Sequence, residues 1–234
     1  MTAALPPALL ERLRAIDTPT ICNGLEIVAP DRRGTGYTTR PLVCLREDMA
    51  PIVGYARTAT IRARDLPTAS AAEERQRRLD YYAYVEKGPL PSIMVIEDRD
   101  PEPGHGAFWG EVNTSVHKGL GSLGVITNGS IRDLDQCAAG FQLLAGSVGP
   151  SHAYVRVETF DAPVTVAGMA VSPGDLIHAD RHGAVVIPAE VAPQLPAAVD
   201  LLVRREAVIL EASRRGDFDF AALARAIGES DDIH

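Results

Sequence analysis

The sequence has few cysteines, few aromatic residues and no long apolar run, and each scarcity excludes a class of protein. Its three cysteines, Cys22, Cys44 and Cys137, form no CxxC pair, which argues against a disulfide framework and favours reduced thiols. No apolar run approaches the roughly 20 residues of a membrane span. The segment Met1–Arg14 lacks a basic stretch followed by an apolar one, so we expect no export signal and a cytoplasmic protein.

Positive charge is also scarce. The chain has 23 Lys and Arg against 31 Asp and Glu, a formal net charge of −8. A nucleic-acid groove needs clustered basic residues, so we predict no nucleic-acid partner. The local cluster Glu73–Arg78 mixes signs and is typical of the solvated face of a helix. With 234 residues, 46% of them hydrophobic, the chain is long enough to bury a core without disulfides or metals as staples.

The order of patterns along the chain predicts an α/β fold. We expect helices at 6–13, from 17 to near Gly24, at 69–87, 111–118 and 190–227 with a break at Gly216; strands at 52–61, 92–97, 124–127 and 141–148; an extended arm at 29–46; and hairpins within 152–188. Strand 92–97, the glycine-rich loop 98–110, the next helix and strand 124–127 form a βαβ crossover. We predict one domain over 1–234, with N-terminal helices and an arm in 1–50 and a helical tail in 190–234.

Candidate site residues lie where this crossover begins and ends. Gly110, Glu111, Val112 and Asn113 stand at a helix start, where free amide groups and the helix dipole favour a carboxylate. Arg132–Asp133 follows the next strand; the arginine can clamp an oxo acid and the aspartate can hold a hydrated Mg²⁺. An Arg-Asp pair after a strand and a Gly-Glu helix start are both common, so spacing alone favours a structural role.

Several segments together resemble the RraA-like family. Glu111, twenty residues and then Arg132–Asp133 is similar to that family's acidic-x20-Arg-Asp signature. Three further stretches agree in order: LRAIDTPTICNGL, VGYARTAT and GDLIHADRHGAVVIP. The family includes 4-hydroxy-4-methyl-2-oxoglutarate/4-carboxy-4-hydroxy-2-oxoadipate aldolases and the regulator of ribonuclease E activity. The resemblance covers the chain from about Leu13 onward.

The resemblance implies a swivelling β/β/α sandwich, assembled as homotrimers or homohexamers, and a role for each site residue. Arg132 would bind the carboxylate and carbonyl oxygen of pyruvate or its enolate, and the amides near Val112 and Asn113 would take the carboxylate. Asp133 would ligate Mg²⁺ or Mn²⁺ directly, with Glu111 holding its waters. A neighbouring subunit would contribute an acidic residue. The implied chemistry is retro-aldol cleavage or decarboxylation of small 2-oxo acids.

Two positions depart from the family pattern and leave the substrate open. The aldolases have an acidic residue three positions after the aspartate, where this chain has Gln136, with Asp135 one earlier. The acidic position of the second N-terminal helix is Asn23 here. The arm from Ala29 to Met49 could also mark a subgroup with a different pocket.

Other residues are weaker candidates. Glu206 and Glu211 lie five residues apart on the tail helix, and one could reach a neighbour's site, although a solvated helix charge is the simpler interpretation. His178, Asp180 and His182 alternate along one segment and could bind a metal together, but polar residues of a surface turn are the simpler interpretation. His105 and His117 could serve as acids or bases, although solvated histidines are more common. We expect Cys137 to be buried. Trp109 could wall the pocket or pack an interface.

Two functions of different classes therefore compete. One is a divalent-metal 2-oxo acid aldolase or decarboxylase, and a related possibility is recruitment of the same site to another lyase step. The alternative is a non-catalytic protein that binds a ribonuclease. Arg132, Asp133 and Glu111 favour the enzyme, because a regulator has no need of groups that stabilise an enolate.

Overall fold

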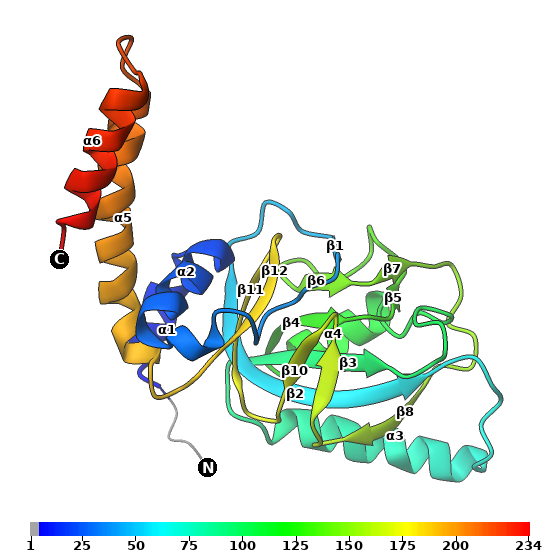
Figure 1. The fold of residues 1–234 in the computed structure, drawn as a ribbon. Coiled ribbons are helices and arrows are strands. Elements are labelled where there is room, and N and C mark those ends of the chain that lie inside the picture. Colours follow the sequence, from blue (N-terminus) through cyan, green and yellow to red (C-terminus); the bar gives the residue numbers. More distant parts are fainter. Residues whose placement is uncertain (1–4) are drawn as a thin grey trace.

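A strongly bent β-sheet forms the centre of the molecule (Figure 1). The computed structural model describes residues 5–234, so the first four residues of the predicted N-terminal segment lie outside the described part. The helices are α1 (Pro7–Arg14), α2 (Thr18–Val28), α3 (Ala71–Glu86), α4 (Glu111–Gly119), α5 (Leu195–Ser213) and α6 (Phe220–Asp231), with 3-10 turns at Pro30–Arg32 and Ala192–Gln194. The strands are β1 (Val43–Cys44), β2 (Ile52–Arg62), β3 (Ser92–Asp98), β4 (Ser122–Thr127), β5 (Ser130–Ile131), β6 (Gln142–Ala145), β7 (Ser147–Val148), β8 (Arg156–Phe160), β9 (Val164–Val166), β10 (Met169–Val171), β11 (Leu176–Asp180) and β12 (Gly183–Ile187).

The large sheet combines a parallel centre with antiparallel edges. Its strand order is β1-β6-β4-β3-β2-β11-β12, and β8 also pairs with β2. Strands β2, β3, β4 and β6 run parallel, so the predicted βαβ crossover from β3 through α4 to β4 is confirmed. Strand β2 pairs with β11 at its start and with β8 at its end, and ten of its eleven residues are buried, as expected of a strand covered on both faces.

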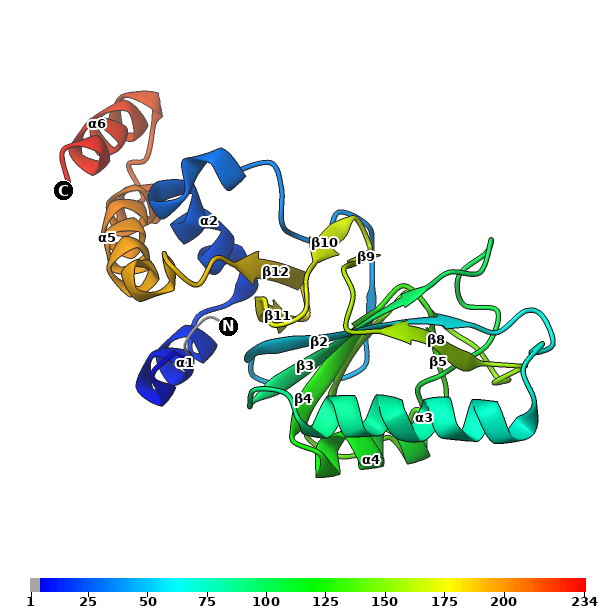
Figure 2. The ribbon, with the colours of Figure 1, turned by 90° about the horizontal axis from the view of Figure 1, so that it is seen from below.

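Different layers cover the two faces and one end of the sheet. Figure 2 shows α3 and α4 on one face, the β9–β10 hairpin on the other, and the N- and C-terminal helices at one end. Each layer packs on its own apolar cluster. Tyr81 of α3 joins Met94 and Trp109 in one cluster, whereas Leu13 and Leu195 lie among the terminal helices. The α/β class with N-terminal helices and a C-terminal helical tail is confirmed. No helix within residues 5–234 is long and apolar enough to cross a membrane.

The predicted strand at 141–148 is wrong as a single element. It divides at Gly146 into β6, in the large sheet, and β7, which pairs with β5. The Gly146 amide donates to the carbonyl of Gly129 at 3.0 Å, and a Cβ at Gly146 would lie 2.3 Å from the carbonyl oxygen of Asn128. The chain changes partners where two backbones touch, and glycine permits that approach.

Two predicted boundaries in the N-terminal region also change. Helix α2 continues past Gly24 to Val28, because this glycine serves packing: a Cβ there would lie 3.2 Å from Leu195 and Val199 of α5. The predicted arm contains a 3-10 turn and the short strand β1. The predicted break of the tail near Gly216 is confirmed, between α5 and α6.

Candidate active site

The residue that precedes helix α4 has no side chain with which to cap it. This N-cap residue is Gly110, and no side chain accepts a hydrogen bond from the first turn in the usual capping position. Thr114 closes the first turn instead, with its amide and hydroxyl both donating to the Gly110 carbonyl at 3.0 and 2.8 Å. The earlier amides have no partner within the helix, and Val112 is 72% exposed. The Glu111 amide donates to Asp133, so the helix presents the amides of Val112 and Asn113 together with the positive end of its dipole.

The backbone brings Arg132 to this helix start. Ile131 bridges to Trp109 beside it, and the Arg132 amide donates to the Trp109 carbonyl at 2.9 Å. The loop after β3 and the segment after β4 are thus joined at Trp109 and Ile131, the residues that directly precede Gly110–Glu111 and Arg132–Asp133. Sequence reasoning placed them on one side of the sheet, and the structure brings them into contact.

Asp133 adopts an uncommon backbone conformation that turns its carboxylate toward α4. Its φ is +51°, in the left-handed region that Asp tolerates better than most residues. Its Oδ2 atom lies 3.5 Å from Arg132 Nε and 3.3 Å from the amide nitrogen of Glu111. A Cβ at Gly110 would lie 2.5 Å from the same oxygen. Glycine at this position therefore makes room for the carboxylate.

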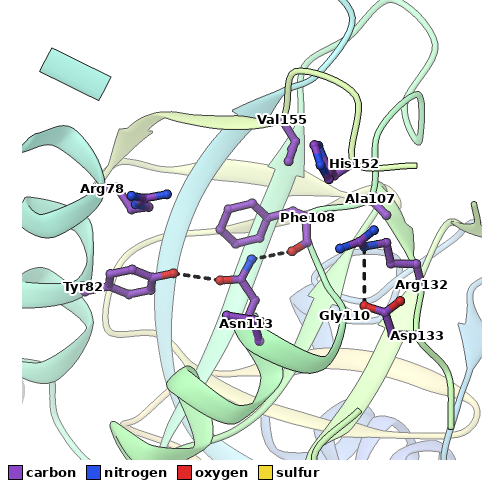
Figure 3. A pocket seen from close by; sticks show the side chains of 11 residues that line it. Arg78, Tyr82, Ala107, Phe108, Gly110, Asn113, Arg132, Asp133, His152 and Val155 are labelled. Carbon is purple, nitrogen blue, oxygen red and sulfur yellow. Dashed lines mark hydrogen bonds and ion pairs between the residues drawn. The ribbon is translucent and has the colours of Figure 1, made fainter. Parts of the chain in front are cut away.

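A pocket of about 250 Å³ lies between these groups and α3 (Figure 3). Of the predicted residues, Gly110, Val112, Asn113, Arg132 and Asp133 line it. The side chains of Arg132 and Asp133 are 36% and 35% exposed, so both remain accessible to a ligand. Glu111 is exposed but is not among the lining residues, and its contact with Asp133 is made by its backbone.

Sequence reasoning missed the opposite wall. Arg78 and Tyr82 project from α3 across the pocket from Arg132, with Phe108 between the walls, and His152 also lines it (Figure 3). Arg78 is exposed, as the interpretation of Glu73–Arg78 as a solvated helix face requires, and it also lines the pocket. The available signal was the spacing of Arg78 and Tyr82, since residues four apart share one helix face.

A hydrogen-bonded network supports the pocket from behind. The Tyr82 hydroxyl donates to Asn113 Oδ1 at 2.8 Å, and Asn113 Nδ2 donates to the Phe108 carbonyl. His117 is fully buried, with Nδ1 2.6 Å from the Asn113 carbonyl and Nε2 2.7 Å from the Tyr81 hydroxyl. A carbonyl only accepts, so Nδ1 carries the proton and Tyr81 donates to Nε2. Burial lowers the pKa of His117 to about 4, which keeps the imidazole neutral.

The carboxylates present fit only a cation that keeps most of its waters. Within residues 5–234, no three His, Cys, Asp or Glu side chains gather into a potential metal-binding group. Asp133 offers one accessible carboxylate at the pocket, in the space left by Gly110, and Glu111 is the residue that follows Gly110 in the chain. Mg²⁺ often binds through one or two carboxylates together with water, so this donor set suits it, whereas a dehydrated zinc site would need more ligands.

The predicted residues of the tail helix lie elsewhere. Glu206 and Glu211 are exposed on α5, and the α5–α6 hairpin stands away from α3 and α4 in both views (Figures 1 and 2). They do not line the pocket of their own chain. Their contribution to a neighbouring subunit stays a prediction.

The histidine-rich stretch forms a structural cluster at the other end of β2. His178 Nδ1 lies 3.0 Å from Thr18 Oγ1, and its Nε2 lies 3.1 and 2.9 Å from the carbonyls of Leu13 and Ile16. Asp180 accepts from the amides of Thr18 and His182 at 2.9 and 2.8 Å. The expected turn is confirmed, since β11 ends at Asp180 and β12 begins at Gly183. The expected surface setting is wrong for His178 and Asp180, which are buried.

Two remaining candidates belong to the core. Cys137 is 3% exposed, as predicted, and burial raises the pKa of its thiol. Trp109 is fully buried and its ring stacks on Phe141 with centroids 5.7 Å apart. It therefore packs the interior behind the pocket and does not line the cavity, which corrects the suggestion that it forms the wall or an interface.

Known proteins resemble this chain in sequence and in fold. A family model described as Aldolase/RraA, of the RraA-like family, matches residues 18–186. Protein DlpA of Legionella pneumophila is 26% identical over 110 residues, which are 45% of this chain and 17% of that protein. The chain thus matches less than a fifth of that relative's length.

Two solved structures share the fold over nearly the whole chain. An uncharacterized protein from Pseudomonas syringae pv. tomato superimposes with a TM-score of 0.72 and 20% identity, covering 98% of this chain and 97% of that one. RraAS2 of Streptomyces coelicolor, described as an unusual member of the RNase ES inhibitor RraA protein family, gives 0.68 and 21%, covering 92% and 100%. The family resemblance and the RraA-like fold predicted from the sequence are confirmed, and the chain belongs to the RraA-like family.

Proposed function

We propose that the protein is a divalent-metal-dependent lyase that cleaves small 2-oxo acids by retro-aldol reaction or decarboxylation. The observation that carries this proposal is the meeting of Arg132 and Asp133 with the start of α4 across one accessible pocket. An anion site and a hard-cation ligand lie side by side there. The RraA-like family includes aldolases as well as ribonuclease regulators, and this juxtaposition favours catalysis.

The residues of the pocket divide the binding of the 2-oxo acid between them. The free amides of Val112 and Asn113 receive the substrate carboxylate at the positive end of the α4 dipole. The Arg132 guanidinium donates two hydrogen bonds, to the carboxylate and to the 2-oxo oxygen. Asp133 would hold Mg²⁺ or Mn²⁺ directly and Glu111 through water. When bound, the cation supplies Lewis acidity toward the 2-oxo oxygen.

Bond cleavage moves negative charge toward Arg132. In a 4-hydroxy-2-oxo acid, the hydroxyl loses its proton, the C3–C4 bond breaks, and its electron pair is delocalised onto the 2-oxo oxygen. C4 becomes the carbonyl of one product, and a proton added at C3 completes the second product, a 2-oxo acid. In oxaloacetate, the same electron flow releases carbon dioxide. Arg132, held in place by its backbone bond to Trp109, stabilises the oxygen that gains charge.

The test measures pyruvate release from oxaloacetate and 4-hydroxy-2-oxo acids after EDTA treatment and metal add-back. We expect turnover only with Mg²⁺ or Mn²⁺, and its loss in Arg132→Ala and Asp133→Ala. Arg215→Ala and Asp217→Ala provide a matched control, because they break an exposed Arg–Asp pair at 3.0 Å on the C-terminal hairpin. Metal-independent turnover, or full activity in both pocket variants, would contradict the mechanism.

The second candidate is a regulator that binds a ribonuclease, and the fold likeness to RraAS2 is the observation that favours it. It predicts tight binding to a ribonuclease without turnover of any 2-oxo acid. It also predicts that Arg132→Ala leaves the regulatory effect intact. The same variant thus separates the two functions.

A further inference from the structure

A second hollow adjoins the pocket along α3. It has a volume of about 390 Å³, larger than the 250 Å³ of the pocket, and the two share Arg78, Phe108 and Val155 in their walls. We call this second hollow the α3 groove. Because three residues line both hollows, the hollows adjoin each other, and a ligand that occupies both would place its 2-oxo acid end at Arg132 and its far end in the groove. The α3 groove is therefore larger than the pocket that would hold the reacting carbons.

Positive charge is concentrated along the α3 groove. Arg75, Arg78 and Arg156 line it together with a single carboxylate, Glu74. That carboxylate is already paired with Arg77 at 2.8 Å. Among residues 5–234, the three lining arginines form no ion pair with a carboxylate within 4.0 Å. In a chain of net charge −8, such a group of unpaired cations favours an anionic ligand.

The arginine of β8 is held toward the groove by neutral groups. Arg156 Nη1 donates to the backbone carbonyls of Asp65 and Tyr154 at 2.7 and 3.3 Å. Carbonyl partners fix the position of a guanidinium without cancelling its charge. Within the described part of the chain its other donors have no partner, so they can bind a carboxylate, which a guanidinium recognises through parallel hydrogen bonds.

The rest of the groove is apolar. Pro67, Ala69 and Val157 line it beside Phe108 and Val155, so its floor suits a hydrocarbon chain or ring. Its length follows from α3: Arg78 and Ala71, which both contribute to the lining, are seven residues apart, or about 10 Å at 1.5 Å per residue. A ligand with several carbons between two acidic ends matches this spacing of apolar floor and cationic rim.

We propose that the α3 groove binds the leaving half of the substrate, and that this half is an apolar chain or ring ending in a carboxylate. The proposal rests on the proposed function, which places the 2-oxo acid end at Arg132. It makes the preferred substrate an extended 2-oxo diacid with several carbons beyond the bond that breaks. Arg75 and Arg156 determine this specificity, because they bind the distal carboxylate away from the reacting atoms.

Binding of a graded series to the Mg²⁺-loaded protein tests the proposal by titration calorimetry. Pyruvate, 2-oxooctanoate and 2-oxosuberate share the 2-oxo acid end, and the last two differ in the distal carboxylate at equal chain length. We expect 2-oxosuberate to bind about tenfold more tightly than 2-oxooctanoate, the size of a charge-assisted hydrogen bond. Arg75→Ala and Arg156→Ala should each reduce that ratio severalfold, whereas Lys87→Ala, an exposed basic residue at the α3 C-cap, should keep it.

The outcomes separate this proposal from the function on which it rests. Binding of all three acids with equal affinity overturns the groove proposal and leaves the proposed function standing. Failure of every 2-oxo acid to bind overturns both. A change of oligomeric state in Arg75→Ala or Arg156→Ala, measured by light scattering, would assign the groove to a second copy of the chain and overturn the proposal.

Discussion

The Arg132–Asp133 pocket and the His178–Asp180 cluster contain similar polar side chains but use them in opposite ways. In the cluster, both ring nitrogens of His178 and both oxygens of Asp180 contact groups of the same chain. In the pocket, Asp133 and Arg132 are one-third exposed beside a helix start that its own N-cap residue, Gly110, does not cap. One set of groups is satisfied internally, and the other retains hydrogen-bonding capacity for a ligand.

This difference shows how a ligand-binding site can be distinguished from a structural cluster of similar polar residues. Buried polar groups with all their partners stabilise a fold; here they join the α1–α2 connection to β11 through Thr18 and the carbonyls of Leu13 and Ile16. Polar groups that converge on a cavity without such partners can bind a substrate. The sequence contains candidates of both kinds, and the partners decide between them.

The largest effect we expect concerns the buried histidine behind the pocket. The pKa of His117 lies at about 4, below its ordinary value of 6.5, because of burial. Below pH 6.5 the His117 imidazole binds a proton in the unfolded chain, whereas in the folded chain it binds one only near pH 4. The free energy of unfolding should therefore be fully present above pH 6.5 and lose about 3 kcal/mol as pH falls to 4.

Urea unfolding across this pH range measures the loss. His117→Gln should flatten the decline between pH 6.5 and 4, whereas His105→Gln, at an exposed position, should not. Equal slopes in both variants would show that His117 does not behave as a satisfied internal group. The pKa of His178 is also lowered by burial, so part of the slope should remain.

Gly110→Ala tests the Arg132–Asp133 pocket without changing any charge. The backbone of Gly110 is extended, with φ −165°, so alanine fits the backbone, but its Cβ would lie 2.5 Å from Asp133 Oδ2. We expect the carboxylate to move and kcat/KM for oxaloacetate to fall about 100-fold, as when one charge-stabilising group is lost. Gly119→Ala, at the other end of α4 with no atom within 4 Å of its Cβ, should keep activity. Similar activities would mean that the position of Asp133 is unimportant.

Asp180→Asn tests the His178–Asp180 cluster. Burial alone would raise the pKa of this carboxyl, but hydrogen bonds from Thr18 and His182 outweigh it and hold the pKa below its ordinary value. An asparagine amide would set a donor against one of these N–H groups, so the free energy of unfolding should fall by about 2 kcal/mol. Lyase activity per folded molecule should not change. A selective loss of activity with normal unfolding would assign the cluster a role in catalysis.

The same contrast explains how far the sequence could predict the site. Gly110 and Arg132–Asp133 were predictable because a βαβ order fixes which helix and strand ends meet. Arg78 was not, because a polar helix face has the same pattern whether it meets water or a pocket, and α3 is oriented by the packing of Tyr81 on His117. Gly24 predicted a helix end but serves a close contact with α5. Local patterns give elements and their order, whereas side-chain surroundings depend on the packing between them.

The smallest effect concerns α5, whose glutamates lie outside both regions. Glu206 and Glu211 are exposed, and their helix stands apart from the pocket of their own chain (Figure 1). Glu206→Gln and Glu211→Gln should each change kcat/KM by no more than about twofold, the range of a surface substitution. A tenfold loss would contradict this. If mixing such a variant with Asp133→Ala subunits then restored activity, α5 would complete the pocket of a neighbouring subunit. Assembly of subunits would then supply the missing partners of the pocket, whereas folding of a single chain supplies those of the histidine cluster.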